Sequence, residues 1–360
     1  MIPELDQLNG SNQTELEKNG EHFEFKAPVT EAVSIGDTII VGFGDGKIRF
    51  FKPDHEPHDI QAHSGVILCM VRSENYILTG GDDGRFLQIS IDGDIEEIAN
   101  FGSRWVDSVA AYKGDRVCSS DNVVYIWSEE NEKKSFKHQS TISGLSFSPN
   151  GKHLAVSRYG GVTVWERKKN KWTSSNYAWK GSHGKVTFSP DGKYLVTSMQ
   201  ENQLHGWRLS DKADLAMSGY PSKIKSFNWV GDTPYLVTSG ASEAVCWPFD
   251  GKEGPMGRKP VCVASGGKQY ATFVESLSEE NAVFVGFRDG LVLLSEIDEK
   301  KNSITVRYPT GSEVSAIVVS ESREDILIAV SYTHLRAHET REDRGIPRGG
   351  EKKKGGGGGG

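Results

Sequence analysis

Residues that could carry chemistry are few in this 360-residue chain, and they are not gathered into a motif. The polar run Met199–Gln203, followed by His205, places Glu201 near a histidine, and these are residue types that general acid–base catalysis uses. The segment Gly42–Lys47 (GFGDGK) has the glycines and the lysine of a phosphate loop, but no helix is expected after it to hold an anion. The spacings G-x-S-x-G and H-E-x-x-H are absent. We therefore expect no catalytic, cofactor-binding or metal site.

The elements that position these residues follow a repeat of about forty residues. Ser143–Trp165 (SGLSFSPNGKHLAVSRYGGVTVW) and Gly184–Trp207 (GKVTFSPDGKYLVTSMQENQLHGW) share one pattern. Each has an apolar run, an S-P-x-G-K turn, a second apolar run, a polar turn and a third run that ends in Trp. Apolar and polar residues alternate with period 2, which predicts strands joined by tight turns. Glu201 and the GFGDGK segment both fall at the turn between the second and third strands, which disfavours catalysis by Glu201 and phosphate binding by the GFGDGK segment.

Weaker copies of the pattern precede and follow these two. The turns Asp45-Gly46, Asp83-Gly84 and Asp289-Gly290 occupy the same place in their copies, where a tight connection needs a positive φ. The last copy breaks off near Val330, before a third strand. The weaker copies are Val29–Phe51, His63–Ser90, Trp105–Trp127, Lys223–Trp247, Tyr270–Leu294 and an eighth that begins at Glu313.

The repeat resembles the WD-repeat (WD40) family of β-propellers over about Val29–Val330, in a divergent form of bacterial type. In that family a His, a Ser or Thr, a turn Asp and a Trp hydrogen-bond within each blade. Thr79, Ser157 and Ser198 are the hydroxyl residues that the resemblance implies, and the turn Asp is present at Asp83 but missing in the fourth and fifth copies. No Trp is followed by Asp, so the network is expected to be partial. The His position is matched by His63, His138 and His183, and the Trp position by Trp127, Trp165, Trp207 and Trp247.

Composition limits the partners and the compartment. The chain has a net charge of −7, which disfavours nucleic acid as a partner. The N-terminal residues are polar and acidic, so neither a signal peptide nor a membrane span is expected. The four cysteines are scattered without C-x-x-C spacing, which is typical of buried thiols in a reducing cytoplasm. We expect a cytoplasmic protein.

The predicted fold is an all-β, WD40-type β-propeller with seven complete four-stranded units and a truncated eighth; the alternative is a seven-bladed ring. Residues 1–24 are predicted to be a polar, flexible segment, and 25–330 the propeller. Residues 331–360 lose all strand periodicity and end in six glycines. The string SYTHLRAHET in this segment resembles a translated sequencing adapter, so 331–360 is interpreted as a non-native, disordered tail.

A ring with short turns favours a non-enzymatic scaffold that presents one face to a protein or peptide. The chain is expected to be a monomer within a larger complex. The alternative is a propeller enzyme, hydrolytic or metal-dependent, with its site in the axial channel. Large residues fall just before the first strand of a copy or at its second-to-third-strand turn, among them Arg104, Arg158, Trp179, Glu243 and Arg288. From these positions we predict one partner-binding patch made of Trp105, Tyr159, Lys180, Gln200, Glu201 and Tyr220.

Overall fold

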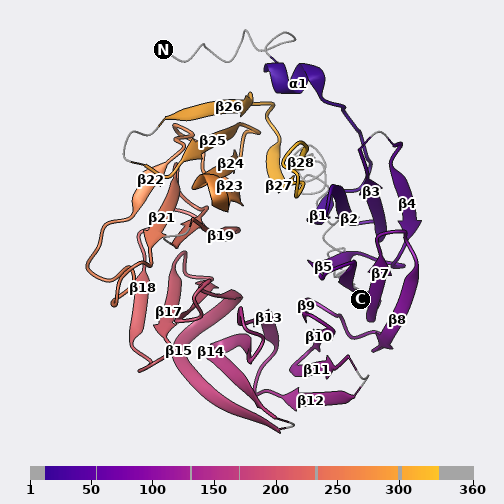
Figure 1. Cartoon of the computed structure of the whole chain (residues 1–360), viewed down its shortest axis with the longest axis vertical. Helices are drawn as coiled ribbons and strands as arrows, with labels where there is room; N and C mark the ends of the chain where they lie inside the picture. The colour runs from indigo at the N-terminus through magenta and orange to yellow at the C-terminus, as the bar shows by residue number, and fades with distance from the viewer. Residues whose placement is uncertain are drawn as a thin grey trace, which may run out of the picture.

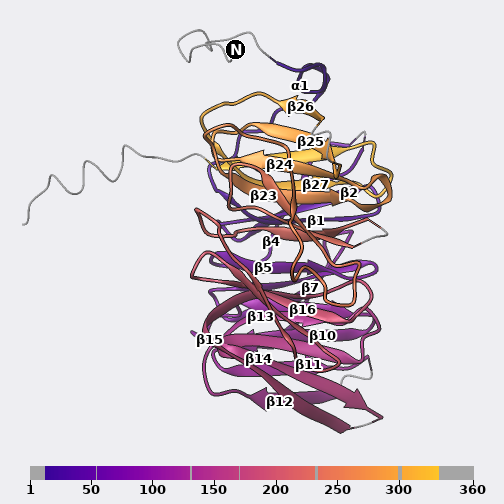
Figure 2. The same ribbon diagram turned by 90° about the vertical axis from the view of Figure 1, so that its left-hand side faces the viewer.

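The structure is a computed structural model of the whole chain. It describes residues 13–53, 55–129, 132–169, 171–231, 234–298 and 302–331. In these residues the chain forms a ring of antiparallel sheets around a central axis (Figure 1). Seen from the side, the strands run across the thickness of the ring, so each strand begins at one face and ends at the other (Figure 2).

Three four-stranded sheets form the first part of the ring. Within each, consecutive strands pair antiparallel, as the period-2 alternation predicts. The first sheet is β1 (Val29–Ile35), β2 (Thr38–Phe43), β3 (Lys47–Phe51) and β4 (His58–Gln61); the second is β5 (Ile67–Arg72), β6 (Tyr76–Gly81), β7 (Arg85–Ser90) and β8 (Ile95–Asn100); the third is β9 (Ser108–Tyr112), β10 (Asp115–Ser120), β11 (Val123–Trp127) and β12 (Lys133–Lys137).

The rest of the ring contains one six-stranded, two four-stranded and one two-stranded sheet among the described residues. Two short helices complete the elements, α1 (Glu15–Asn19) and the 3-10 turn η2 (Ser278–Glu280). The six-stranded sheet is β13 (Ile142–Phe147), β14 (His153–Lys168), β15 (Lys171–Phe188), β16 (Tyr194–Met199), β17 (Leu204–Arg208) and β18 (Asp214–Met217); the next is β19 (Phe227–Val230), β20 (Tyr235–Thr238), β21 (Ala244–Pro248) and β22 (Val261–Val263); then β23 (Ala271–Leu277), β24 (Ala282–Phe287), β25 (Val292–Glu296) and β26 (Ser303–Arg307); last come β27 (Glu313–Val319) and β28 (Ile326–Ser331).

The six-stranded sheet contains the fourth and fifth copies of the repeat. Fully extended, the 16 residues of β14 would span about 50 Å. The Arg167 amide nevertheless donates to Lys152 O at 2.8 Å, so β14 folds back on itself and serves as two strands. Its turn lies at Gly160 and Gly161, whose φ angles of 86° and 129° suit glycine. β15 leaves the fourth copy as its outer strand and enters the fifth as its inner strand.

The core lies between neighbouring sheets, because each sheet buries both of its faces against the next. Trp207 is 1% exposed and packs with residues of β14 and β15, so the Trp position of the repeat lies in the core in the fifth copy. Inner strands contact one another around the ring, including β1 with β27. Between the inner strands β15 and β19, the Trp229 Nε1–H donates to Thr187 Oγ1 at 3.0 Å. Neighbouring sheets thus support one another, as expected of a repeat fold.

The strand directions define two faces of the ring. Ser108, at the start of β9, pairs with Ser119, near the end of β10. The start of each inner strand and the turn between the second and third strands therefore lie at the same end of a sheet. We call this end the upper face, and the opposite end, where the inner strands finish, the lower face. At the upper face Gly46, Gly84 and Gly290 have φ of 79°, 77° and 92°, as their Asp-Gly turns require.

The ring closes at the two-stranded sheet of the eighth copy. β27 contacts both β1 and β23, whereas β28 pairs with β27 alone among the described residues. The segment before β1 spans the neighbouring sheets. Thr14 Oγ1 donates to Val306 O of β26 at 2.7 Å, and the Phe25 ring lies 5.2 Å from that of Phe43 in β2. Residues 332–360, which contain the predicted non-native tail except Ser331 of β28, lie outside the described residues.

The all-β propeller predicted from the repeat is confirmed. Each of the eight copies supplies strands to the ring, with the fourth and fifth joined in one sheet and the eighth reduced to β27 and β28. Short turns between long apolar strands leave the two faces as the places where exposed polar and aromatic side chains collect. A functional site is therefore expected at one of these two faces.

Candidate functional site

Five of the six residues predicted to bind a partner are exposed at upper-face positions. Trp105 precedes β9 and is 59% exposed, and Tyr159 stands at the turn within β14 and is 61% exposed. Lys180 is exposed just before the inner part of β15, and Gln200 and Glu201 are exposed at the turn after β16. The Gln200 amide donates to Ser182 O at 3.3 Å, which holds this turn beside the start of the inner strand.

Tyr220 does not belong with them, and its prediction is corrected. The side chain is 8% exposed, and its hydroxyl accepts from Trp247 Nε1 at 2.6 Å. The same hydroxyl bonds Thr238 Oγ1 at 2.7 Å. Burial raises the pKa of Tyr220 to about 12, so the phenol stays protonated. Tyr220 is a structural residue inside the ring because these two bonds use its only polar group.

The three histidines at the His position of the repeat, His63, His138 and His183, are buried and hydrogen-bonded. His63 Nδ1 meets Asp83 Oδ1 at 2.9 Å, and its Nε2 meets Thr79 Oγ1 at 2.9 Å. Burial lowers the pKa of His63, against the opposing effect of Asp83. The imidazole is therefore neutral, with Nδ1–H as the donor to Asp83. This copy has the His, Thr and Asp of the implied network, and Thr79 is the hydroxyl predicted from sequence.

The hydroxyl predictions for two other copies are wrong. His183 Nδ1 bonds Thr197 Oγ1 at 2.8 Å, one residue before the predicted Ser198. Ser157 Oγ donates to Gly184 O rather than to a histidine. In that copy the Trp165 Nε1–H donates directly to His138 Nε2 at 3.4 Å. The errors have one cause: alternate residues of a strand point to opposite faces, and a one-residue difference in register changes the partner.

Glu201 and His205 are not brought together for acid–base chemistry. Glu201 is exposed, whereas His205 is 1% exposed and stacks on the Trp179 ring at 3.9 Å. Burial lowers the pKa of His205 to about 4, and its Nε2 lies 3.3 Å from Asp214 Oδ1. Its face-to-face contact with Trp179 orients that ring, which stays 38% exposed at the upper face. His205 and Trp179 therefore pack against each other, and Trp179 presents an aromatic surface at the upper face.

The channel wall carries half-buried carboxylates that sequence reasoning did not single out. Burial raises the pKa of Glu31 in β1, and the charge of Lys185 in β15 opposes this rise. Burial also raises the pKa of Glu275 in β23 to about 7, although the Asn228 amide donates to its Oε2 at 3.4 Å. The sequence signal was available, because both glutamates interrupt the apolar pattern of an inner strand.

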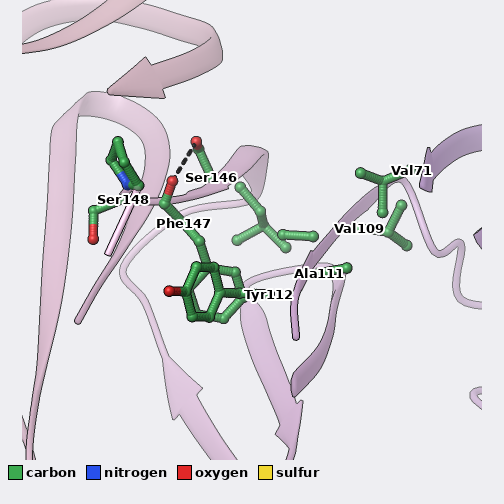
Figure 3. Close-up of a pocket in the computed structure, with 10 residues that line it drawn as sticks. Val71, Val109, Ala111, Tyr112, Ser146, Phe147 and Ser148 are labelled. Carbon is green, nitrogen blue, oxygen red and sulfur yellow. Dashed lines mark hydrogen bonds between the residues drawn. The ribbon is translucent and has the colours of Figure 1, made fainter. Parts of the chain in front are cut away.

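A cavity of about 310 Å³ lies at the lower ends of β5, β9 and β13. Valine, alanine and leucine side chains line it, together with the rings of Tyr112 and Phe147 (Figure 3). The hydroxyl of Ser146 is used within the wall, where it donates to Phe147 O at 3.3 Å. The cavity therefore offers apolar contact but few free polar groups, and it lies at the other end of the strands from Trp105 and Tyr159.

Other chemistry finds no support in the described part of the chain. Across those residues no three His, Cys, Asp or Glu side chains are grouped to hold a metal ion. All four cysteines are free thiols, and three of them are buried. Burial raises the pKa of the Cys69 and Cys118 thiols well above the usual value, which makes both poor nucleophiles. No helix in the described residues is long and apolar enough to cross a membrane.

Comparison with known proteins gives the same repeat. Residues 130–166 match the family model described as WD domain, G-beta repeat. The chain is 23% identical over 205 residues to Periodic tryptophan protein 2 of Arabidopsis thaliana, covering 46% of this chain and 23% of that protein. It is 24% identical over 192 residues to Echinoderm microtubule-associated protein-like 2 of Mus musculus, covering 51% and 29%. It is 22% identical over 239 residues to Pre-mRNA-processing factor 19 homolog 2 of Arabidopsis thaliana, covering 61% and 42%.

The chain thus spans less than half the length of these curated relatives. Among solved structures, the computationally designed Ika8 protein superposes with a TM-score of 0.69 over 85% of this chain and 94% of that chain. Its sequence identity is 16%, so this likeness concerns the fold. The matched repeat and the ring of antiparallel sheets agree: the chain carries a WD40-type repeat and folds as a β-propeller.

Proposed function

We propose that this chain is a non-enzymatic scaffold whose upper face binds a protein or peptide partner. The observation that carries the proposal is the exposure of two large aromatic side chains, Trp105 at 59% and Tyr159 at 61%, on turns of a rigid ring. Exposed Trp and Tyr are enriched among the residues that dominate binding energy at protein interfaces. Lys180, Gln200 and Glu201 add polar groups at the same face.

The relatives support the same kind of function without naming a partner. The matched curated proteins include one named for microtubule association and one named for pre-mRNA processing. Their names differ, so the shared property that we carry over is the use of a propeller as a protein-binding surface. Because free, buried thiols suit a reducing compartment, we place the chain in the cytoplasm. We also propose that the chain is a monomer within a larger complex.

Affinity capture with matched variants tests the proposal. The double variant Trp105→Ala/Tyr159→Ala should lose specific partner capture while its melting temperature stays close to that of the parent chain. Surface changes usually alter stability by about 0.5 kcal/mol or less. Ile304→Ala is the control, because Ile304 is 66% exposed on the outer strand β26. Equal loss of capture by the control, or full capture by the double variant, would remove the basis for an upper-face scaffold.

A further inference from the structure

Basic side chains collect in one part of the upper face. They stand where the inner strands β15, β19 and β23 begin and at the turn after β24. All are exposed to solvent. We call this set the basic sector: Lys180, Lys185, Lys223, Lys225, Lys268 and Arg288.

Backbone hydrogen bonds hold these segments at the upper face. The Ser222 backbone amide, next to Lys223, donates to Gly240 O at 3.2 Å, two residues after the end of β20. The Arg288 amide donates to Tyr270 O at 3.1 Å, which places the turn after β24 beside the start of β23. The lysines therefore project from fixed turns at the channel mouth, so little backbone ordering is needed when a partner binds.

Nearby carboxylates neutralise only part of this charge. Glu313, at the start of β27, is shared: Lys225 Nζ forms an ion pair with its Oε1, and Arg288 Nε lies 3.9 Å from its Oε2. The Asp289 carboxylate accepts from the Leu291 amide at 3.1 Å within its own turn. Within the described residues, Lys180, Lys185, Lys223 and Lys268 take part in no ion pair. Glu201 and Glu243 also lie at turns of this part of the face, so the six basic side chains stand beside four carboxylates there.

The basic side chains of the sector contrast with the net negative charge of the whole chain. The chain as a whole has a net charge of −7, so an excess of exposed lysines on one part of one face is a local reversal of sign. Lys185 reaches far enough to act on Glu31, on the other side of the channel, and its charge works against the rise in the pKa of that carboxyl.

Aromatic surface borders the sector at one end. Trp179 precedes Lys180, is 38% exposed and is fixed by its stack on His205, with ring centroids 3.9 Å apart. Tyr159 belongs to the turn whose backbone pairs with Ser182 of β15, so it lies beside the same end of the sector. A ligand that covers the sector from this end meets two flat aromatic surfaces and then a row of ammonium groups.

We infer that the basic sector binds an acidic peptide segment, with an aromatic or apolar residue placed on Trp179 and Tyr159 and Asp or Glu side chains on the lysines. This inference rests on the proposed scaffold function and names the chemistry of its partner. Charge complementarity steers such a segment to the face and sets its register. Nucleic acid fits less well, because a long polyanion extending beyond the sector would meet the acidic remainder of the chain.

Binding of three labelled peptides by fluorescence anisotropy tests the inference. Each peptide contains one Tyr and one Leu. The remaining residues are acidic in the first peptide, Gln and Asn in the second, and Lys and Arg in the third. The acidic peptide should bind the full chain, and its affinity should fall as salt rises, because exposed charges are screened. Lys223→Glu/Lys268→Glu should weaken binding by about ten-fold or more, since each reversal replaces an attraction by a repulsion. Lys152→Glu, an exposed change at the lower-face S-P-N-G-K turn, should leave binding unchanged.

The other outcomes separate this inference from the scaffold proposal. Tighter binding of the neutral or basic peptide, still lost in Tyr159→Ala, would overturn the acidic partner and keep the upper-face function. Equal weakening by Lys152→Glu would overturn the sector, because the binding would then depend on overall charge. Tighter binding of a single-stranded DNA oligomer, lost in the same double reversal, would assign the sector to nucleic acid and refute the peptide. Failure of all probes, with no partner captured by the parent chain, would sink both proposals.

Discussion

The hydroxyl of Tyr220 accepts a hydrogen bond from the indole N–H of Trp247 at 2.6 Å. The chain of donors continues to Thr238 Oγ1 at 2.7 Å and from Thr238 to Val245 O at 3.1 Å. In the fifth copy the same place is taken by His183, which bonds Thr197. A tyrosine thus does in the sixth copy what a histidine does in the fifth: it links the segment before the inner strand to the second strand.

This relationship makes Tyr220 a stability residue. Tyr220→Phe should lower the free energy of unfolding by about 1–3 kcal/mol, because it leaves the indole N–H of the half-buried Trp247 without its acceptor. Partner binding at the upper face should not change. Chemical denaturation of the variant measures the effect, with Tyr235→Phe as a matched change in the same sheet. An unchanged unfolding free energy would mean that the hydroxyl is not needed by its neighbours.

Acid should destabilise the ring through His138. Burial lowers the pKa of His138 to about 4 from 6.5, and the nearby Arg158 adds to the shift. The unfolded chain then binds a proton at higher pH than the folded chain does, so the stability present above pH 6.5 is lost as the pH falls toward 4. Protonation would also remove the acceptor that Nε2 offers to Trp165.

Between pH 6.5 and pH 4, protonation of His138 should lower the free energy of unfolding by at most about 3 kcal/mol. His138→Gln should be less stable at pH 7.5 but should show a shallower loss of stability toward pH 4.5. Thermal melts of both chains across this range give the comparison. Parallel curves for the two proteins would contradict a buried neutral His138.

Glu275 should make the folded chain less stable as the pH rises, which is the opposite of the effect of His138. Burial raises its pKa from 4.5 to about 7, so the folded chain holds a proton that the unfolded chain has released. Stability from this group is fully present below about pH 4.5 and is lost as the pH rises through 7. Glu275→Gln should therefore stabilise the chain at pH 8 by up to about 3 kcal/mol and have little effect at pH 4.5. A variant that is less stable at pH 8 would show that the carboxylate is compensated in the channel.

The closing seam should be the least protected part of the ring. β28 pairs with β27 alone among the described residues, and its side chains Ile326, Leu327 and Ile328 are only half-buried. Strands with an unpaired edge open more easily than strands paired on both sides. Native-state hydrogen exchange should be fastest at Val29–Phe51 and Val314–Ala329. Even protection around the ring would contradict this and would favour closure that is independent of the eighth copy.

Phe25 gives a specific variant for the same seam. Its ring meets Phe43 and Phe51, and the Arg49 guanidinium lies 4.2 Å from its centre. Phe25→Ala should speed exchange in β1, β2 and β3 more than in β9 to β12, which lie two sheets further along the ring. Phe136→Ala, in β12, is the matched control that should give the reverse pattern.

Local pattern was enough for the strands and turns. Period-2 alternation, the S-P-x-G-K turn and the polar turn that follows place β13 and the fold-back of β14 correctly, since both depend on neighbours within a few residues. The core place of Trp207 also followed, because the same residue type recurs at one position of the repeat. The exposure of Trp105 and Tyr159 agrees with their place at the turns.

Contacts between copies decided the rest. Tyr220 has the same sequence context as an exposed residue, and only the packing of β19 to β22 shows that Trp247 and Thr238 enclose it. The choice of Thr197 over Ser198 depends on which face of β16 meets His183. The pKa of Glu275 depends on desolvation by strands distant in sequence. Sequence alone determined the repeat and its elements, because those are local; the tertiary structure decided which side chains are buried, paired or presented, because these properties arise where separate copies meet.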